Sequence, residues 1–151
     1  MKVVQVMRKP NDIVFSIEQL FEGLRRELTV EIDVETYVNP YSSRGVWRRL
    51  AGMLRVVRHQ GDVNHVTGDV HYLSILLHRN KTILTIHDCV TLERLGGLKY
   101  KFFWFFWYWL PIKRSRIVTV ISESTKHELL RHLGSGDWDI KVIPNFVSPD
   151  F

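Results

Sequence analysis

The sequence predicts an α/β fold, a Rossmann-like, doubly wound parallel sheet of about six strands. Two observations carry this prediction. Strand-like and helix-like stretches alternate along the whole chain, which is typical of parallel strands joined by right-handed helical crossovers. With 151 residues, 45% of them hydrophobic and 25% charged, the chain also has the length and composition of one globular domain. We therefore expect a single domain over residues 1–151.

The N-terminal half is predicted to contain three strands and two helices. In the first helix the apolar residues recur every three or four positions, after a capping box formed by Ser16 and Gln19. The second strand alternates apolar and acidic residues, which indicates a half-exposed strand near a sheet edge. The predicted strands are residues 3–7, 30–38 and 63–66, and the predicted helices are residues 17–28 and 46–59.

The C-terminal half continues the alternation with three more strands. The last helix is predicted to begin with a capping box formed by Thr125 and Glu128, and Pro144 ends the last strand. The predicted strands are residues 82–86, 117–121 and 140–143, and the predicted helices are residues 70–77, 98–112 and 124–133.

Charge and cysteine content limit the classes of function. The net charge of +5 favours an anionic partner, which is a nucleic acid, a phosphorylated ligand or an anionic lipid surface. The single cysteine, Cys89, excludes a disulfide framework and a four-cysteine metal site, and it suits a reducing cytoplasm. No secretory signal and no transmembrane-length apolar segment is present. We therefore expect a cytoplasmic location.

The sequence motifs of the common cofactors and metals are missing. The loop after the first strand contains Arg8, Lys9 and Pro10 in place of a Gly-rich dinucleotide motif, and there is no P-loop and no nucleophile elbow. His127 and His132 are five residues apart, so they point about 140° apart around a helix and cannot share a metal ion. We predict neither a cofactor nor a metal.

Four short motifs follow the predicted strands. They are Val66-Thr67-Gly68-Asp69-Val70-His71, Thr85-Ile86-His87-Asp88, Val120-Ile121-Ser122-Glu123-Ser124-Thr125 and Lys141-Val142-Ile143-Pro144-Asn145-Phe146-Val147. In this order they resemble the N-terminal domain of glycosyltransferase family 4, whose enzymes have the GT-B architecture of two Rossmann-like domains. The resemblance covers essentially the whole chain. It departs from the family pattern at Phe146, where Gly is usual, and in the first loop, which lacks Gly-Gly.

The resemblance implies a function in sugar transfer. In that family the N-terminal domain mainly holds the acceptor, the C-terminal domain binds the nucleotide-sugar through a Glu-x7-Glu signature, and the configuration of the sugar is retained without a metal. The chain stops just after its sixth strand, so we expect the donor-binding domain to be absent or encoded separately, and the chain alone to be a poor catalyst. The alternative is a non-catalytic binding module that keeps the fold.

The candidate site residues follow the carboxyl ends of strands, where open α/β sheets bind ligands. His87 is the leading catalytic candidate, because an imidazole titrates near neutrality and can hydrogen-bond a sugar hydroxyl. The resemblance also places this histidine beside the transferred sugar. Asp88 is the second catalytic candidate, although its carboxylate would equally cap the next turn. Arg8 and Lys9 form either a phosphate site or a solvated basic loop.

Four further residues are candidates for binding the acceptor. Gly68 permits a tight turn or the close approach of a ligand. Ser122 and Thr125 either contact the acceptor or cap the helix that follows them. His71 is the weakest candidate of the four.

Eight consecutive aromatic residues, 102–109, lie between lysines and arginines. Trp and Tyr favour the headgroup layer of a membrane, and adjacent cations attract anionic lipid. The predicted lipid contacts are Phe103, Trp104, Phe106, Trp107, Arg48 and Arg55. Several members of the family are likewise peripheral membrane proteins that act on lipid-linked acceptors. The alternative is that half of the rings pack on the sheet and the rest cover a protein interface. The sequence is poorly suited to binding nucleic acid, because its aromatic residues are contiguous rather than interleaved with basic residues on strands.

Overall fold

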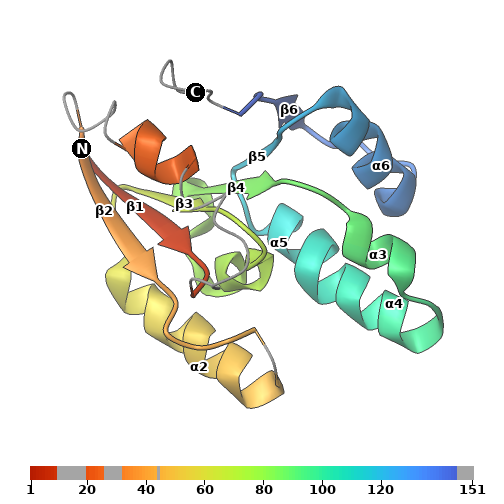
Figure 1. The fold of residues 1–151 in the computed structure, drawn as a ribbon, viewed down its shortest axis with the longest axis horizontal. Coiled ribbons are helices and arrows are strands. Elements are labelled where there is room, and N and C mark those ends of the chain that lie inside the picture. The colour runs from red at the N-terminus through yellow and green to blue at the C-terminus, as the bar shows by residue number, and fades with distance from the viewer. Residues whose placement is uncertain (10–19, 26–31, 44, 146–151) are drawn as a thin grey trace.

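The computed structural model describes residues 1–9, 20–25, 32–43 and 45–145. In these ranges six strands form one sheet in the order β2-β1-β3-β4-β5-β6, and every neighbouring pair is parallel (Figure 1). The strands are β1 (Lys2–Met7), β2 (Asp33–Val38), β3 (Val63–Val66), β4 (Thr82–Ile86), β5 (Ile117–Val120) and β6 (Ile140–Val142). The predicted α/β fold class is confirmed.

The edge position of β2 follows from its sequence pattern. The strand pairs only with β1, in a register that sets Val34 opposite Val3. Its acidic residues Asp33 and Glu35 are exposed, whereas Tyr37 is buried. An alternating pattern of this kind is what a strand with one solvated face needs, so the prediction of a half-exposed edge strand is confirmed.

Helical segments connect the strands. Residues 20–25 are helical, and the predicted capping box of Ser16 and Gln19 lies outside the described residues. The remaining segments are α2 (Val46–Val56), η1 (Val57–His59), η2 (His71–Leu76), η3 (Arg79–Lys81), α3 (Val90–Arg94), α4 (Gly97–Phe103), η4 (Trp104–Trp109), α5 (Leu110–Lys113) and α6 (Glu123–Leu133).

Three helix predictions need correction. The predicted helix 70–77 is the 3-10 helix η2, and the predicted helix 98–112 is a continuous segment in which a π-helical stretch, η4, separates α4 from α5. The helix α6 is capped by Ser122, whose side chain accepts the backbone N–H of Thr125, rather than by a box of Thr125 and Glu128. The Ser122 hydroxyl already satisfies that N–H, so the helix begins one residue earlier than predicted.

The hydrophobic core lies on one face of the sheet. On that face Val4, Val6, Leu84, Ile86 and Val120 are fully buried, and side chains of α2, η2, η4, α5 and α6 belong to the same cluster. The opposite face carries the alternate residues of each strand, several of which are only half-buried. The carboxyl ends of all six strands meet at one edge of the sheet, because the strands are parallel. Among the described helices none combines the length and apolar character that crossing a bilayer requires.

Candidate functional site

A polar pocket of about 330 Å³ opens where β1, β3 and β4 end. It is lined by Arg8, Gly68, Asp69, His71, His87, Asp88, Val90 and Thr91. Five of the eight residues predicted to be catalytic or acceptor-binding therefore line one pocket. Lys9, Ser122 and Thr125 do not line it.

The side chains of Ser122 and Thr125 form hydrogen bonds with backbone groups near the pocket instead of lining it. The Ser122 hydroxyl caps α6, and the Thr125 hydroxyl donates a hydrogen bond to the backbone carbonyl of His87, over 3.3 Å. Thr125 is buried, so this bond is protected from water. The helix start therefore holds the loop that carries His87. Lys9 is exposed.

His71 is a buried, neutral imidazole in the pocket wall. Its Nδ1 lies 3.0 Å from the backbone carbonyl of Trp107, an acceptor, so Nδ1 carries the proton. Nε2 is then the nitrogen that can accept a hydrogen bond from a ligand. Burial lowers the pKa of His71 to about 4, and the bond to Trp107 only partly opposes this.

His87 directly follows β4, and its ring is nearly perpendicular to that of Phe21, with the ring centroids 5.9 Å apart. Its Nε2 is buried and has no hydrogen-bond partner among the described residues. Burial lowers the pKa of His87 to about 4. The nearby His71 imidazole and Arg8 also disfavour a second positive charge here, whereas Asp88 opposes the shift. The expectation that this imidazole titrates near neutrality is therefore corrected: with a pKa of about 4, His87 is uncharged at pH 7.

Three lining residues were not predicted from the sequence, Asp69, Val90 and Thr91, and of these Asp69 is the titratable one. Enclosure by the pocket raises the pKa of Asp69 to about 6, although the residue keeps exposed surface at the mouth. The charge of Asp88 adds to the rise, whereas Arg8 opposes it. The Trp107 indole N–H lies close to this carboxyl group without reaching hydrogen-bond geometry. Asp69 is therefore the carboxylate that titrates near neutral pH, where a general base is most effective.

Backbone geometry presents the two carboxylates. Gly68, directly before Asp69, has a φ of +72°, a conformation that favours glycine, and this turn brings the β3 loop into the pocket. The Asp88 carboxylate accepts the backbone N–H of Val90 over 3.1 Å, which is the turn cap considered as the alternative to catalysis. Asp88 is exposed, and among the described residues its second carboxylate oxygen has no recorded hydrogen bond, so it is available to a ligand.

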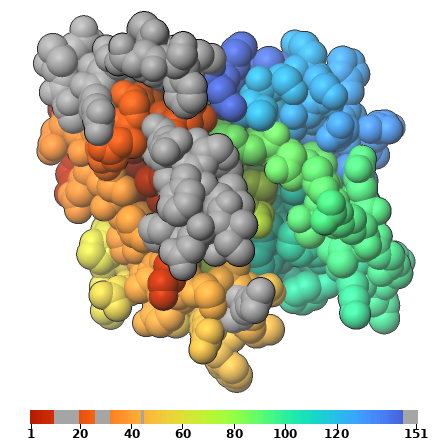
Figure 2. Space-filling view, viewed as in Figure 1, coloured from red at the N-terminus to blue at the C-terminus, as the bar shows by residue number. Residues whose placement is uncertain are grey.

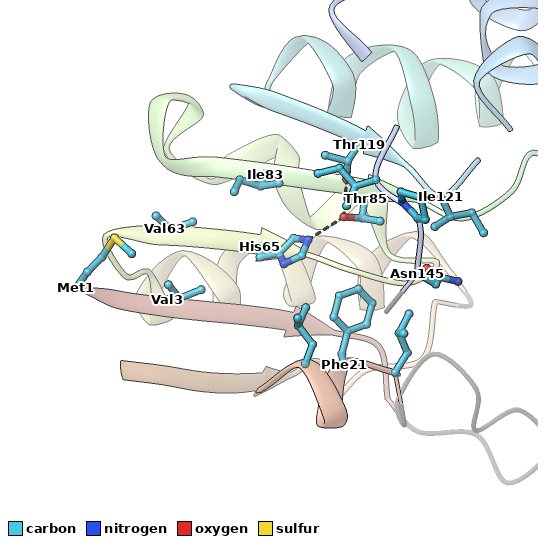
Figure 3. Close-up of a pocket in the computed structure, with 14 residues that line it drawn as sticks. Met1, Val3, Phe21, Val63, His65, Ile83, Thr85, Thr119, Ile121 and Asn145 are labelled. Atoms are coloured by element: carbon cyan, nitrogen blue, oxygen red, sulfur yellow. Dashed lines mark hydrogen bonds between the residues drawn. The ribbon is translucent and has the colours of Figure 1, made fainter. Parts of the chain in front are cut away.

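A larger, apolar cavity of about 470 Å³ lies on the open face of the sheet, between the strands and the helical residues 20–25 (Figure 3). His65 points into it from β3, and its Nε2 forms a 2.8 Å hydrogen bond with Thr85, which bonds Thr119 in turn. None of the described residues that line this cavity has a charged side chain. The His65 imidazole is a poor base, because burial lowers its pKa to about 4. The described lining therefore offers neither a cation for a phosphate nor an effective base, and the smaller polar pocket is the better candidate site.

The aromatic segment 102–109 has an inner and an outer side. Trp107 is only 3% exposed, and Trp104 is half-buried with its indole N–H donating to the carbonyl of His132. Phe103 stacks on Trp107, whereas Phe106 is 37% exposed. Arg48 and Arg55, the predicted cationic contacts, are exposed on α2.

The family model described as Glycosyltransferase Family 4 matches residues 14–151 of the chain. The chain belongs to glycosyltransferase family 4. Its substrates are therefore expected to be a nucleotide-sugar donor and an acceptor, and its sheet is consistent with one half of a GT-B fold. A search of curated proteins found no match. In this family-4 chain the matched region contains Asp69, His71, His87 and Asp88, but not Arg8. Among the described residues no group of three or more His, Cys, Asp or Glu is placed to hold a metal ion.

Proposed function

We propose that this chain is the acceptor-binding half of a glycosyltransferase, and that the acceptor hydroxyl lies in the pocket between Asp69 and His87. The supporting observation is the pairing of a carboxylate of pKa about 6 with a neutral imidazole whose buried Nε2 has no partner among the described residues. A buried polar atom without a partner costs free energy, and a ligand hydroxyl in this pocket would remove that cost.

Each group of the pocket has a role in the proposed transfer. Asp69 accepts the hydrogen bond of the acceptor hydroxyl and takes its proton as the oxygen bonds to the anomeric carbon. The bond from that carbon to the nucleoside diphosphate breaks, and the leaving phosphate keeps the electron pair. Arg8 supplies positive charge beside that phosphate. His87 orients the sugar, and Asp88 binds a second hydroxyl. For the configuration to be retained, as in the family pattern, the acceptor oxygen bonds to the face of the anomeric carbon from which the phosphate departs. No metal takes part in the proposed transfer.

The donor belongs to a second domain in this proposal. The residues of the pocket bind hydroxyls and one phosphate, whereas recognition of the nucleotide is assigned to a C-terminal, donor-binding domain outside these 151 residues. The protein acts at the cytoplasmic face of a membrane, where it reaches a lipid-linked acceptor. This part of the proposal is supported by large apolar side chains exposed next to cations on α2 and α4. Both helices reach the surface in the space-filling view (Figure 2).

The test is nucleotide-sugar-dependent transfer by the chain combined with a family-4 donor-binding domain. Asp69→Asn should lower kcat at least tenfold at pH 7, and wild-type kcat should rise with pH through about 6, because only ionised Asp69 accepts the proton. His87→Gln should raise KM for the acceptor. Asp137→Asn, a change at an exposed carboxylate far along the sequence, is the matched control.

Two outcomes would decide against the proposal. Unchanged kcat in Asp69→Asn would remove the carboxylate from the reaction. Absence of transfer with every donor tried would favour the alternative function, a binding module that has kept the family fold without the reaction.

A further inference from the structure

An apolar groove of about 250 Å³ runs between α2 and the aromatic segment. Leu50 and Met53 form one wall, and Phe102, Phe106 and Trp107 contribute to the other. An enclosed cavity of about 150 Å³ with a similar lining stays dry and binds benzene. The groove therefore has room for several methylene groups of a hydrocarbon chain.

The groove and the polar pocket share one wall. The Trp107 ring faces the groove, and the backbone carbonyl of the same residue accepts the hydrogen bond of His71, which lines the pocket. The next residue along η2, Tyr72, lines the groove, and its ring lies 4.7 Å from the ring of Trp107. The two sites are thus separated by the thickness of a few side chains.

Arg49 lies at the junction of the two sites. Its guanidinium group is 4.4 Å above the Trp107 ring, and its Nε donates to the backbone carbonyl of Ser43 over 2.7 Å. Arg49 does not line the polar pocket, but its charge is close enough to oppose slightly the rise in the pKa of Asp69. A guanidinium has five N–H donors, and among the described residues only the Ser43 carbonyl accepts one of those of Arg49, which leaves the others for an anionic ligand.

Positive charge surrounds the groove in the sequence as well. Between Thr36 and Gly61, a range that includes α2, there are five arginines and no acidic residue. From Arg94 to Ser122 inclusive, a range that contains the aromatic segment, there are six lysines and arginines and again no acidic residue. The elements that form the groove therefore favour a ligand with an anionic group beside its apolar part.

We propose that the groove holds the hydrocarbon chain of a phosphate-bearing lipid acceptor, with the phosphate at Arg49 and the polar head in the pocket of Asp69 and His87. The inference rests on the proposed function, since it requires the acceptor to occupy that pocket. Its basis is the order of three environments: an apolar groove, a cation and a polar pocket. An amphipathic phospholipid presents a chain, a phosphate and hydroxyls in the same order.

Binding of short alkyl phosphates to the intact chain, measured by calorimetry below their micelle concentrations, tests the groove. Decyl phosphate should bind at least tenfold more tightly than hexyl phosphate, since each methylene buried adds about a fourfold factor. Inorganic phosphate should show no binding at the same concentrations. Equal affinity of the wild-type chain for the two alkyl phosphates would overturn the proposal, because the affinity of a site that binds only the phosphate does not depend on chain length.

Two pairs of variants locate the ligand. Leu50→Gln, in the groove, should weaken decyl phosphate about tenfold, whereas Leu54→Gln, one turn along α2 and outside the groove, should leave it unchanged. Arg49→Gln should weaken decyl phosphate but not decyl glucoside, and Arg49→Lys should retain most of the binding. Equal effects of the two leucine changes would overturn the groove assignment.

The result is separable from that of the transfer assay. Chain-length-dependent binding with no sugar transfer would keep the groove as a lipid site and reject the catalytic proposal. Transfer to water-soluble acceptors that is insensitive to Leu50→Gln, with no preference for decyl phosphate, would keep the catalytic proposal and reject the groove.

Discussion

The buried imidazole of His71 should make stability depend on pH. Its pKa is about 4 in the folded chain, against an ordinary value of 6.5. Between pH 6.5 and 4 the unfolded chain binds a proton that the folded chain does not, so the free energy of unfolding falls as the pH falls through this window. At about 1.4 kcal/mol per pKa unit, the full effect is about 3 kcal/mol.

His71→Asn keeps an N–H donor for the Trp107 carbonyl but removes the titration. Urea unfolding at pH 7 and pH 4.5 should show a loss of stability that is about 2 kcal/mol smaller in this variant than in the wild type. His78→Asn, a change at an exposed side chain, controls for the substitution itself. An identical loss in the wild type and His71→Asn would mean that other groups cause the acid sensitivity.

Asp69 shows the limit of prediction at the residue scale. The sequence places it in a motif after β3, beside a glycine, and this is enough to put it near the strand ends. Its raised pKa depends on enclosure and on Asp88, Arg8 and Arg49, which belong to other segments. A sequence does not state these distances. The residue type alone therefore predicts a pKa near neutrality for His87, whereas in the structure it is the pKa of Asp69 that lies at about 6.

At the scale of elements, the start of α6 should contribute to stability and to the pocket together. The Ser122 hydroxyl accepts the N–H of Thr125 over 3.1 Å, and Ser122→Ala removes this cap. The expected cost is about 1 kcal/mol in the free energy of unfolding, measured with urea. Ser122→Asp, which restores a capping oxygen, should recover most of it. A cost below about 0.3 kcal/mol in Ser122→Ala would show that the cap is not formed in solution.

In the aromatic segment, the sequence pattern could not determine which rings are buried and which are exposed. Eight consecutive rings predict a helix that is apolar all round, and both lipid contact and core packing remained open. The orientation of each ring depends on the π-helical stretch η4, in which hydrogen bonds span five residues rather than four. Trp107 and Tyr108 consequently lie in the core, and Phe102 and Phe106 face outward. The sequence contains no signature that predicts this π-helical hydrogen bonding.

The inner and outer tryptophans should respond differently to truncation. Trp107→Ala should lower the free energy of unfolding by about 3–5 kcal/mol, because it empties a large volume in the core. Trp47→Ala, at a side chain that is 83% exposed on α2, should change it by less than about 0.5 kcal/mol. Guanidinium unfolding of both variants measures the difference, and similar costs would contradict the burial of Trp107.

At the scale of the whole molecule, the topology was the most predictable feature. Alternating strands and helices lead to a parallel sheet because right-handed crossovers are strongly favoured, and a parallel sheet brings its carboxyl ends to one edge. Residues from the ends of β1, β3 and β4 could therefore be grouped before their contacts were known. Which face of the sheet is the more deeply buried could not be predicted from the sequence in the same way. Val4 and Ile86 are completely buried, whereas Val63 and Ile83 on the other face are only half-buried.

Charge and exposed apolar surface occur together on α2 and α4. Trp47 and Leu54 on α2, and Leu98 and Phe102 on α4, are each more than half exposed, next to lysines and arginines in acid-free stretches of sequence. Each cation near an anionic membrane surface contributes about 1 kcal/mol of attraction. The chain should therefore sediment with phosphatidylglycerol vesicles and much less with phosphatidylcholine vesicles.

Salt and truncation separate the electrostatic and apolar contributions to this binding. Raising the salt from about 0.1 M to 1 M shortens the screening length from about 10 Å to about 3 Å, so most of the bound fraction should be released. Trp47→Ala should weaken binding to phosphatidylglycerol vesicles severalfold at low salt, because an exposed indole is lost from the headgroup layer. Ile143→Ala, at an apolar side chain 57% exposed after β6, should leave it unchanged. If both variants sediment like the wild type, or if neutral vesicles bind equally well, the surface of α2 and α4 faces protein rather than lipid.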